Sequence, residues 1–536
     1  MSDHCPKTTA QLNCSIPNVQ TMHGDTSSCD CSSLVGPGSD PARISYAFHA
    51  CLATFPSIFR RADGHVMALA SSFRQELVRR KVTDDTSPYA VTAEVWLING
   101  DTGEPLCEPV AIPQASIFGG VYAYLDGSDD GLVVTTTVKT DDRRVQTQIV
   151  KVTARGRDEG GLDLNAPEVL ADITAGLASA DADMPDSIVS LSPDSSGAIW
   201  FVTAQGNVGV SGPFGTPNPP LFVWSIAGAE TVNNSFSTTR HPWLGDVAAL
   251  TTNKALYIFV KDPRNGAPKQ LHRLPYATGA GPNPKPGQLE YPPSIYLPEN
   301  EQQLYGTGST PSFFGPEHGA EWVTITDNAT DALNLLVFDV ATGDLVTSTS
   351  LFHDSDPRAP HARATENSCI AFGNTVFVPS TSGYPYPVKP FFEHRDTKFV
   401  GGLTRVDIQT DGNGVFTANP VWTQYHRSAA VPRWSLQDGN IYTITRQSGG
   451  KIQTDTARLR DTFSYTVIEP VRGDILLQIP LEMTASAPKD HLSPEILHGF
   501  GNPLQMTCCM TTDTSGAPVM WQGTMGGYYR IKGPSA

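Results

Sequence analysis

Short apolar or small-residue strands alternate along this chain with turns rich in Gly, Asp and Asn and with strands of β-branched and aromatic residues. Three copies of the strand–turn–strand unit read SIVSLSPDSSGAIWFVTAQG (187–206), NSCIAFGNTVFVPSTSG (367–383) and VPRWSLQDGNIYTITRQSG (431–449). A marker in the second strand recurs in steps of 67, 66, 58, 66, 53, 65 and 78 residues, at Val66, Val133, Ile199, Tyr257, Val323, Val376, Ile441 and Val519. Strand repeats of this length are typical of radial blades.

The repeat predicts an all-β fold: a single closed β-propeller of eight four-stranded blades, with seven blades as the alternative. The last blade shows only three strands, so we expect a strand from residues 43–57 to complete it and to remove a free edge. Residues 1–42 are expected to form a flexible tail, and residues 43–533 the propeller. The predicted blades cover roughly residues 50–112, 117–175, 187–227, 232–276, 307–352, 365–424, 430–486 and 498–533.

A second motif marks the turns between outer strands, at residues 99–104, 339–344 and 469–474. An acidic or amide side chain followed by Gly and another acidic residue suits a turn in which that side chain bonds its own backbone and Gly takes a positive φ. The motif resembles the outer hairpin of quinoprotein-like β-propellers. TGSTPSFF, TENSCIAFGNTVFV, GGLTRVDI and AVPRWSLQDGNIYTIT are similar to an uncharacterised family of quinoprotein-like (PQQ-repeat-like) propellers, over about residues 230–450. That resemblance implies a fold and no known activity.

Quinoprotein dehydrogenases themselves match poorly. Their cofactor site would need a Trp floor, a vicinal disulfide and a calcium ion, whereas the only Cys-Cys pair here, Cys508-Cys509, falls in the last predicted blade. A quinone-dependent oxidoreductase is therefore the least favoured function.

Charge and composition exclude two classes of binding partner, nucleic acids and membranes. The net charge of −17 argues against nucleic acid, which requires clustered Lys and Arg. No apolar run is long enough to span a membrane, and the first residues lack the basic and apolar blocks of a signal peptide. A soluble, cytoplasmic monomer is expected. Cys5, Cys14, Cys29 and Cys31 suggest either a small zinc site or, as their spacing favours, incidental cysteines in a flexible leader.

Polar residues recur where each inner strand begins and where each second strand ends, and in a propeller both positions lie at one mouth of the channel. Amide and carboxylate oxygens there are ligands for Ca²⁺, which takes about six to eight oxygens. The predicted calcium ligands are Asn234, Asp327, Asn328, Glu366 and Asn367. They loosely resemble the axial metal sites of six-bladed lactonase-type propellers (strictosidine-synthase and paraoxonase type). Alternatively, such residues only hydrogen-bond neighbouring blades.

The same mouth is the predicted active site. Glu366 or Asp327 would act as base, a metal or Arg433 would polarise a substrate, and His498 would act as acid. The aromatic insertion at 384–399 is expected to form either a lid over the channel mouth or a packed surface loop. The predicted substrate contacts are Asn233, Thr310, Arg446, Asn502, Tyr384 and Phe391. The loop histidines His353, His361, His394 and His426 are expected to be solvated.

Two functions stay open. The polar inner strands slightly favour an enzyme that acts on a small molecule by lyase, isomerase, cyclase or lactonase-like hydrolase chemistry. The alternative is a non-catalytic propeller that binds a protein partner on its rim.

Overall fold

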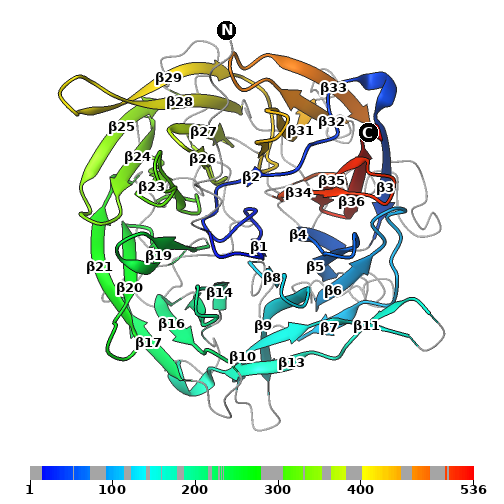
Figure 1. Ribbon diagram of the computed structural model, residues 1–536, viewed down its shortest axis with the longest axis horizontal. Helices are drawn as coiled ribbons and strands as arrows, with labels where there is room; N and C mark the ends of the chain where they lie inside the picture. The colour runs from blue at the N-terminus through cyan, green and yellow to red at the C-terminus, as the bar shows by residue number, and fades with distance from the viewer. Residues whose placement is uncertain are drawn as a thin grey trace, which may run out of the picture.

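Eight antiparallel sheets surround a central axis in the computed structural model, each sheet running outward from the axis as one blade (Figure 1). The eight-bladed, all-β propeller predicted from the repeat is confirmed. The structure describes residues 15–51, 53–72, 92–113, 122–139, 145–157, 160–177, 186, 188–203, 205–214, 220–226, 230, 232, 235–278, 306–329, 332–352, 364–381, 401–447, 462–482, 501–503 and 506–535.

The first four blades follow one another along the chain, each running from inner to outer strand. Blade 1 holds β4 (Ala53–Arg60), β5 (Val66–Ser72), β6 (Thr92–Ile98) and β7 (Val110–Ile112). Blade 2 holds β8 (Tyr124–Asp126), β9 (Gly131–Lys139), β10 (Val145–Val152) and β13 (Glu168–Asp172), beside the small hairpin β11 (Ala154–Gly156) and β12 (Leu162–Leu164). Blade 3 holds β14 (Ile188–Pro193), β15 (Ile199–Thr203), β16 (Asn207–Ser211) and β17 (Leu221–Ser225). Blade 4 holds β18 (Ser237–His241), β19 (Gly245–Thr251), β20 (Ala255–Lys261) and β21 (Pro268–Pro275).

The next three blades repeat the same order. Blade 5 holds β22 (Ser312–Phe314), β23 (Trp322–Thr326), β24 (Leu333–Asp339) and β25 (Leu345–Leu351). Blade 6 holds β26 (Ile370–Phe372), β27 (Thr375–Ser380), β28 (Gly402–Thr410) and β29 (Phe416–Gln424). Blade 7 holds β30 (Arg433–Ser435), β31 (Ile441–Gln447), β32 (Thr462–Ile468) and β33 (Ile475–Leu481). Two short helices lie in the described part of the chain, η2 (Pro41–Arg43) and η3 (Thr174–Gly176).

Blade 8 joins the two ends of the chain. Its inner strands are β34 (Cys508–Thr512), β35 (Pro518–Thr524) and β36 (Gly527–Lys532), and its outermost strand is β3 (Ser45–Ala50). β3 pairs antiparallel with β36 over its whole length, from Ser45 opposite Lys532 to Ala50 opposite Gly527. The expectation that a strand from residues 43–57 completes the last blade is confirmed, and the ring has no open edge between its ends.

The core is divided among the faces between successive blades. Eight clusters of buried apolar side chains fill the eight boundaries, including the boundary between blade 8 and blade 1. At that last boundary Phe55 packs edge-on against Trp96 and Tyr528, with ring centroids 5.4 and 5.0 Å apart. Because apolar surface is buried on both faces of every blade, the blades stabilise one another around the whole ring.

The predicted outer turns form as expected. In the turn after β24, the Asp339 carboxylate accepts hydrogen bonds from the backbone N–H groups of Ala341 and Thr342 at 2.9 and 2.8 Å, and Gly343 has φ +77°. Asn99 and Glu469 play the same part in the two other copies.

The prediction that residues 1–42 form a flexible tail is wrong for the part that the structure describes, which begins at Ser15. Two short strands, β1 (Val19–Thr21) and β2 (Cys31–Ser32), join the sheets of blades 2 and 7, and the segment crosses the centre of the ring in dark blue (Figure 1). Residues 25–31 are all buried. Their sequence has no apolar periodicity, because most of them are polar residues that hydrogen-bond within the ring, whereas Cys29 and Cys31 pack in the apolar cluster between blades 6 and 7.

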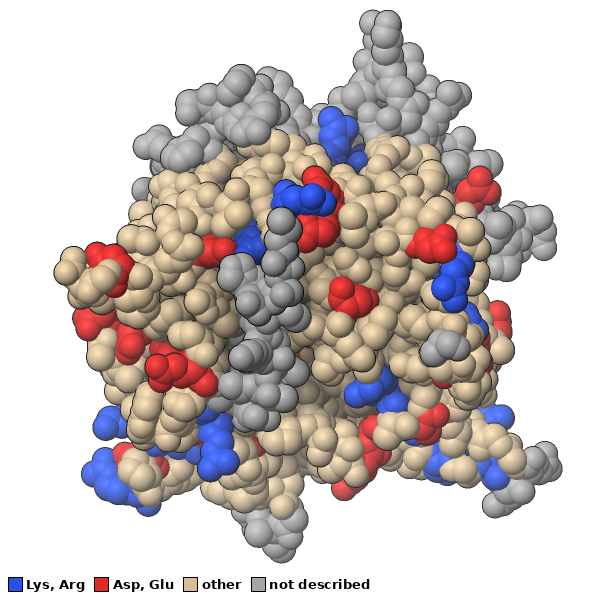
Figure 2. Space-filling view, turned by 45° about the horizontal axis from the view of Figure 1, so that its top comes forward, with Lys and Arg blue, Asp and Glu red and all other residues tan. Residues whose placement is uncertain are grey.

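Two further observations concern the surface. In the view of Figure 2, the described Lys and Arg side chains lie dispersed among Asp and Glu, not in one basic patch. None of the helices in the described part of the chain is long and apolar enough to span a membrane.

Candidate functional site

The N-terminal segment occupies the place where a channel ligand was expected. It runs along the inner strands, and backbone N–H groups of four successive blades donate to its carbonyl oxygens. The donors are Thr238 to Thr26 (2.8 Å), Phe313 to Ser27 (2.9 Å), Ala371 to Cys29 (3.1 Å) and Trp434 to Asp30 (3.1 Å). We call residues 15–32 the axial segment. Its backbone is held as an extended peptide would be held by a row of strand edges.

Charged and polar side chains of the axial segment form a buried network with the inner strands. The Asp30 carboxylate lies 3.0 Å from Nδ1 of His23 and 3.6 Å from Nη1 of Arg433. Ser368 on blade 6 donates to Asp30 at 2.8 Å and lies 2.8 Å from the same His23 nitrogen. Asp30 is 0% exposed and Arg433 is 4% exposed. The opposite charges offset each other's desolvation, which an isolated buried charge could not achieve.

The network contains a hydroxyl–imidazole–carboxylate arrangement. Oγ1 of Thr310 lies 3.1 Å from Nε2 of His23, whose Nδ1 faces Asp30. This order of groups is found in nucleophilic enzymes. Here Thr310 is 1% and His23 4% exposed, and the Thr310 hydroxyl also lies 2.6 Å from that of Ser235. A nucleophile must be accessible to its substrate, and these buried groups are not. In this structure the arrangement therefore serves to link the axial segment to blades 4 and 5.

A second pair of buried groups lies beside the first. The Cys29 thiol donates to the Asp25 carboxylate at 3.2 Å, and the Cys29 backbone N–H donates to the same carboxylate at 3.3 Å. Burial raises the pKa of Asp25, against the lowering effect of those hydrogen bonds. The hydrogen bond with Cys31, together with burial, raises the pKa of the Cys29 thiol well above its ordinary value. Both thiols are free, and a thiol with a raised pKa is a poor nucleophile.

Gly24 shows how tightly the axial segment fits. It has φ +93°, and a Cβ atom built there would lie 2.2 Å from Nη1 of Arg433. The Arg433 guanidinium also donates to the carbonyls of Met22 at 3.2 Å and Cys508 at 3.1 Å. Arg433 thus joins blade 7, blade 8 and the axial segment.

Two predicted site residues, Arg433 and Thr310, do face the axis, but both contact the chain's own axial segment. Two of the predicted calcium ligands, Asp327 and Asn328, hydrogen-bond to groups of the chain itself. Asp327 accepts from the backbone N–H groups of Ala329 and Asn334 and from the Asn334 side chain, at 3.1, 2.9 and 2.7 Å, all within blade 5. All three hydrogen bonds of Asp327 are thus made within one blade.

Asn328 and Asn367 tie neighbouring blades together. The Asn328 amide donates to the carbonyls of Gly306 and Thr365 at 3.0 and 2.9 Å and accepts from the Thr365 N–H at 3.0 Å. Asn367 of blade 6 donates to the carbonyls of Ala429 and Ala430 of blade 7 at 3.3 and 3.1 Å. These contacts match the alternative given for inner-strand polar residues.

Inner-strand hydroxyls continue this pattern around the ring. Ser192 meets Thr238 across blades 3 and 4 at 2.8 Å, and Ser309 donates to the Asn367 carbonyl across blades 5 and 6 at 2.9 Å. Ser312 donates to the Cys369 carbonyl at 3.1 Å across the same boundary. Polar side chains of the inner strands thus form hydrogen bonds across the boundaries between blades, and we call these rows of contacts seams.

The remaining predicted residues divide into two groups. Glu366 and Arg446 are half-buried at the start of blade 6 and the end of β31, and Asn502 is buried before blade 8, where its carbonyl accepts from the Met525 N–H at 2.9 Å. Outside the described residues lie Asn233, Asn234, Tyr384, Phe391, His498, the proposed lid at 384–399, His353, His361 and His394, and Cys5 and Cys14. His426 is not solvated as expected: its Nδ1 is buried, and burial lowers its pKa from 6.5 to about 4.

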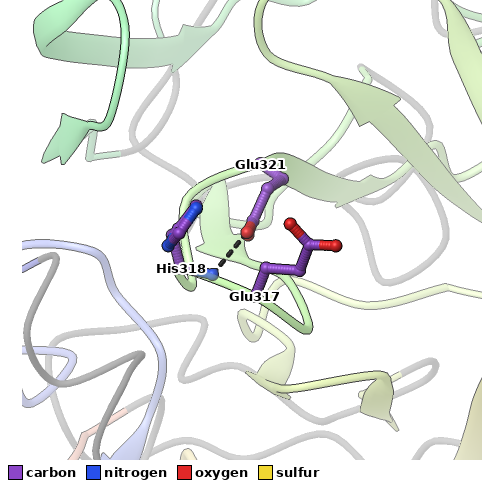
Figure 3. A group of neighbouring side chains, drawn as sticks. All are labelled: Glu317, His318 and Glu321. Carbon is purple, nitrogen blue, oxygen red and sulfur yellow. Dashed lines mark hydrogen bonds between the residues drawn. The ribbon is translucent and has the colours of Figure 1, made fainter.

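A different group of chemically capable side chains lies on the turn face, meaning the face of the ring where the first strand of each blade turns into the second. In the turn between β22 and β23, potential ligand atoms of Glu317, His318 and Glu321 lie within 4.8 Å of one another. Figure 3 shows the Glu321 carboxylate between the His318 ring and the Glu317 carboxylate. The Glu321 carboxylate accepts from the backbone N–H groups of His318 and, at 3.1 Å, Ala320. These residues were not predictable from the sequence, because their spacing matches no metal motif.

Comparison with known proteins finds similar solved structures only at low identity and low TM-score. No model of a protein family and no curated protein sequence matches the chain. The WD40 domain of SCAP from fission yeast is similar with a TM-score of 0.43 at 9% identity, covering 92% of this chain and 98% of that one. A putative 6-phosphogluconolactonase from Bacteroides uniformis gives 0.34 at 12% identity, covering 69% and 87%. A Lactobacillus plantarum protein gives 0.34 at 11% identity, covering 74% and 94%.

At these identities and TM-scores the likenesses carry no argument for a substrate or a partner. The propeller fold rests on the strand pairing itself. The resemblance to quinoprotein-like propellers in particular stays a prediction.

Proposed function

We propose that the protein is a non-catalytic β-propeller that binds a protein partner on its outer surface. The observation that carries this proposal is the axial segment. Its buried side chains contact the inner strands, where an enzyme of this fold would hold a small molecule. Its Asp30 carboxylate is paired with Arg433 of blade 7. A fold does not fix a function, so the argument rests on these residues.

The small-molecule enzyme predicted from the sequence receives less support. Of its candidate groups, Asp327 is committed to hydrogen bonds within blade 5, and Arg433 to Asp30 and two carbonyls. A general base or an electrophile needs a free lone pair or proton aimed at a substrate. In contrast, one large aromatic side chain, Trp243, is 70% exposed on the turn face. Exposed Trp side chains are frequent anchors of protein interfaces.

Size fractionation tests this proposal. An extract of the cells that express the protein is separated into a small-molecule filtrate and a macromolecular retentate, and each is added to the purified full chain. We expect the retentate to give a complex on size-exclusion chromatography whose chemical cross-links fall on exposed residues. We expect the filtrate neither to raise Tm nor to lose a component by turnover.

The matched control is Ser368→Ala, which alters the channel network and leaves the surface intact. The complex should persist in this variant. Turnover of a filtrate component, or a Tm increase by the filtrate that Ser368→Ala removes, would overturn the proposal in favour of a channel enzyme.

A further inference from the structure

Trp243 stands in a rigid turn between β18 and β19. Nδ1 of the buried His241 accepts hydrogen bonds from the backbone N–H groups of Trp243 and Leu244, both at 3.3 Å. The indole packs edge-to-face against the His241 ring and against the His318 ring of the next blade. The ring centroids are 5.3 and 5.7 Å apart, respectively. The exposed ring therefore has a fixed position, and fixed aromatic rings lose little entropy on binding.

The carboxylates of the neighbouring turn give this place its charge. Glu317 is exposed, and Glu321 lies behind it with its carboxylate near His318. Neither forms an ion pair within the described part of the chain. Trp243, Glu317, His318 and Glu321 form what we call the Trp243 patch.

Many of the other turn-face carboxylates form ion pairs, although Asp438 and Asp246 form only hydrogen bonds. In four other blades a Lys or Arg neutralises the turn. Within one blade, Arg61 pairs with Asp63, Lys151 with Asp126 and Asp129, and Lys532 with Asp513. Across two blades, Lys261 of blade 4 pairs with Asp194 of blade 3. The Trp243 patch thus combines uncompensated negative charge with an open aromatic face. That combination is complementary to a cation that carries an apolar stem.

Resting on the proposed function, we infer that the Trp243 patch binds a Lys or Arg side chain of the protein partner. The cationic head would lie against the indole face and near the Glu317 carboxylate, since cation–π and ionic attraction act on the same group there. Direct metal coordination fits less well, because the Glu321 carboxylate already accepts two backbone N–H groups.

The test uses the full-length protein and a fluorescently labelled arginine-rich peptide as probe, with fluorescence anisotropy as the measurement. The matched control is the same peptide with citrulline at each arginine, which keeps the shape and removes the charge. We expect the arginine peptide alone to bind. Trp243→Ala and Glu317→Gln should each weaken binding roughly fivefold to tenfold.

Folding is checked by circular dichroism; Trp243→Ala should keep the wild-type Tm because the side chain is mostly exposed. Glu168→Gln, an exposed carboxylate on β13, is the matched control variant and should bind normally. Equal binding of both peptides, or loss of binding in neither patch variant, would overturn the inference. So would zinc chloride quenching Trp243 fluorescence in a way that Glu321→Gln abolishes, which would make the patch a metal site.

The two proposals fail separately. If a partner complex forms but cross-links away from blades 4 and 5, the patch inference is wrong and the binding function stands. If the filtrate is turned over, the binding function itself is wrong.

Discussion

Arg433 carries a buried positive charge whose contacts are Asp30 and the carbonyls of Met22 and Cys508. We expect Arg433→Met to lower the free energy of unfolding by about 3–5 kcal/mol, because the buried Asp30 carboxylate loses its guanidinium partner and keeps only His23 and Ser368. Urea unfolding measures this change.

The matched variant is Asp30→Asn combined with Arg433→Met. The pair removes both charges, so it should recover much of the stability that Arg433→Met alone loses. Strict additivity of the two single losses would contradict an ionic coupling between these residues.

His426 gives a residue-scale pH dependence. Burial lowers its pKa from 6.5 to about 4, so the folded state holds the ring neutral while the unfolded state binds a proton. The free energy of unfolding should therefore have its full value above pH 6.5 and should decrease as the pH falls from 6.5 toward 4. His426→Gln should fall less steeply in this window when unfolding is followed by urea titration at several pH values.

Part of the fall should remain in that variant, because burial also lowers the pKa of His49 and His241. A variant as acid-sensitive as the parent protein would show that His426 is protonated in the folded state.

At this scale the sequence placed some residues and missed others. Arg433 and Thr310 were predicted to face the axis because strand order fixes where inner strands begin. His23 and Asp30 could not be predicted, because they belong to a segment with almost no strand of its own. Their positions depend on blades 5, 6 and 7, which follow hundreds of residues later.

Among the elements, the blades and outer turns were predictable because they depend on local patterns: alternating strands, Asx side chains and Gly at positive φ. β3 was predictable from a missing fourth strand in blade 8. β1 and β2 were not, since strands of three and two residues leave no periodicity to read.

Deleting residues 1–44 tests the axial segment as an element. The deletion keeps β3 and the closure of blade 8 but removes the carbonyls that accept from four inner strands. We expect a large decrease in Tm by circular dichroism and increased binding of a hydrophobic dye, because buried donors and Arg433 lose their partners.

Adding Arg433→Met to the truncated chain should raise its Tm, since the unpaired charge is removed. An unchanged Tm on deletion would mean that the axial segment contributes nothing to the stability of the ring, contrary to its buried contacts.

For the whole molecule, closure links every blade to two neighbours through apolar clusters and hydrogen-bonded seams. This double linkage gives the Ser, Thr and Asn side chains of the described inner strands a structural role. A polar side chain at a blade boundary satisfies backbone groups there. From sequence, a seam and a ligand site have the same residue types at the same positions, so only the partner of each side chain distinguishes them.

This distinction leads to a prediction about calcium. A bound ion would stabilise the folded ring by mass action, so its removal would lower Tm. Asp327 and Asn328 instead use their oxygens on N–H groups of the chain. The buried Oδ1 of Asn367 has no hydrogen-bond partner among the described residues, but one such oxygen is too few for an ion that takes about six to eight. We therefore expect the Tm of the full chain, followed by scanning fluorimetry, to be the same in EDTA and in calcium chloride. Glu366→Gln should behave identically in both. A Tm that falls in EDTA, recovers with calcium and loses this response in Glu366→Gln would restore the axial calcium site and, with it, the case for chemistry in the channel.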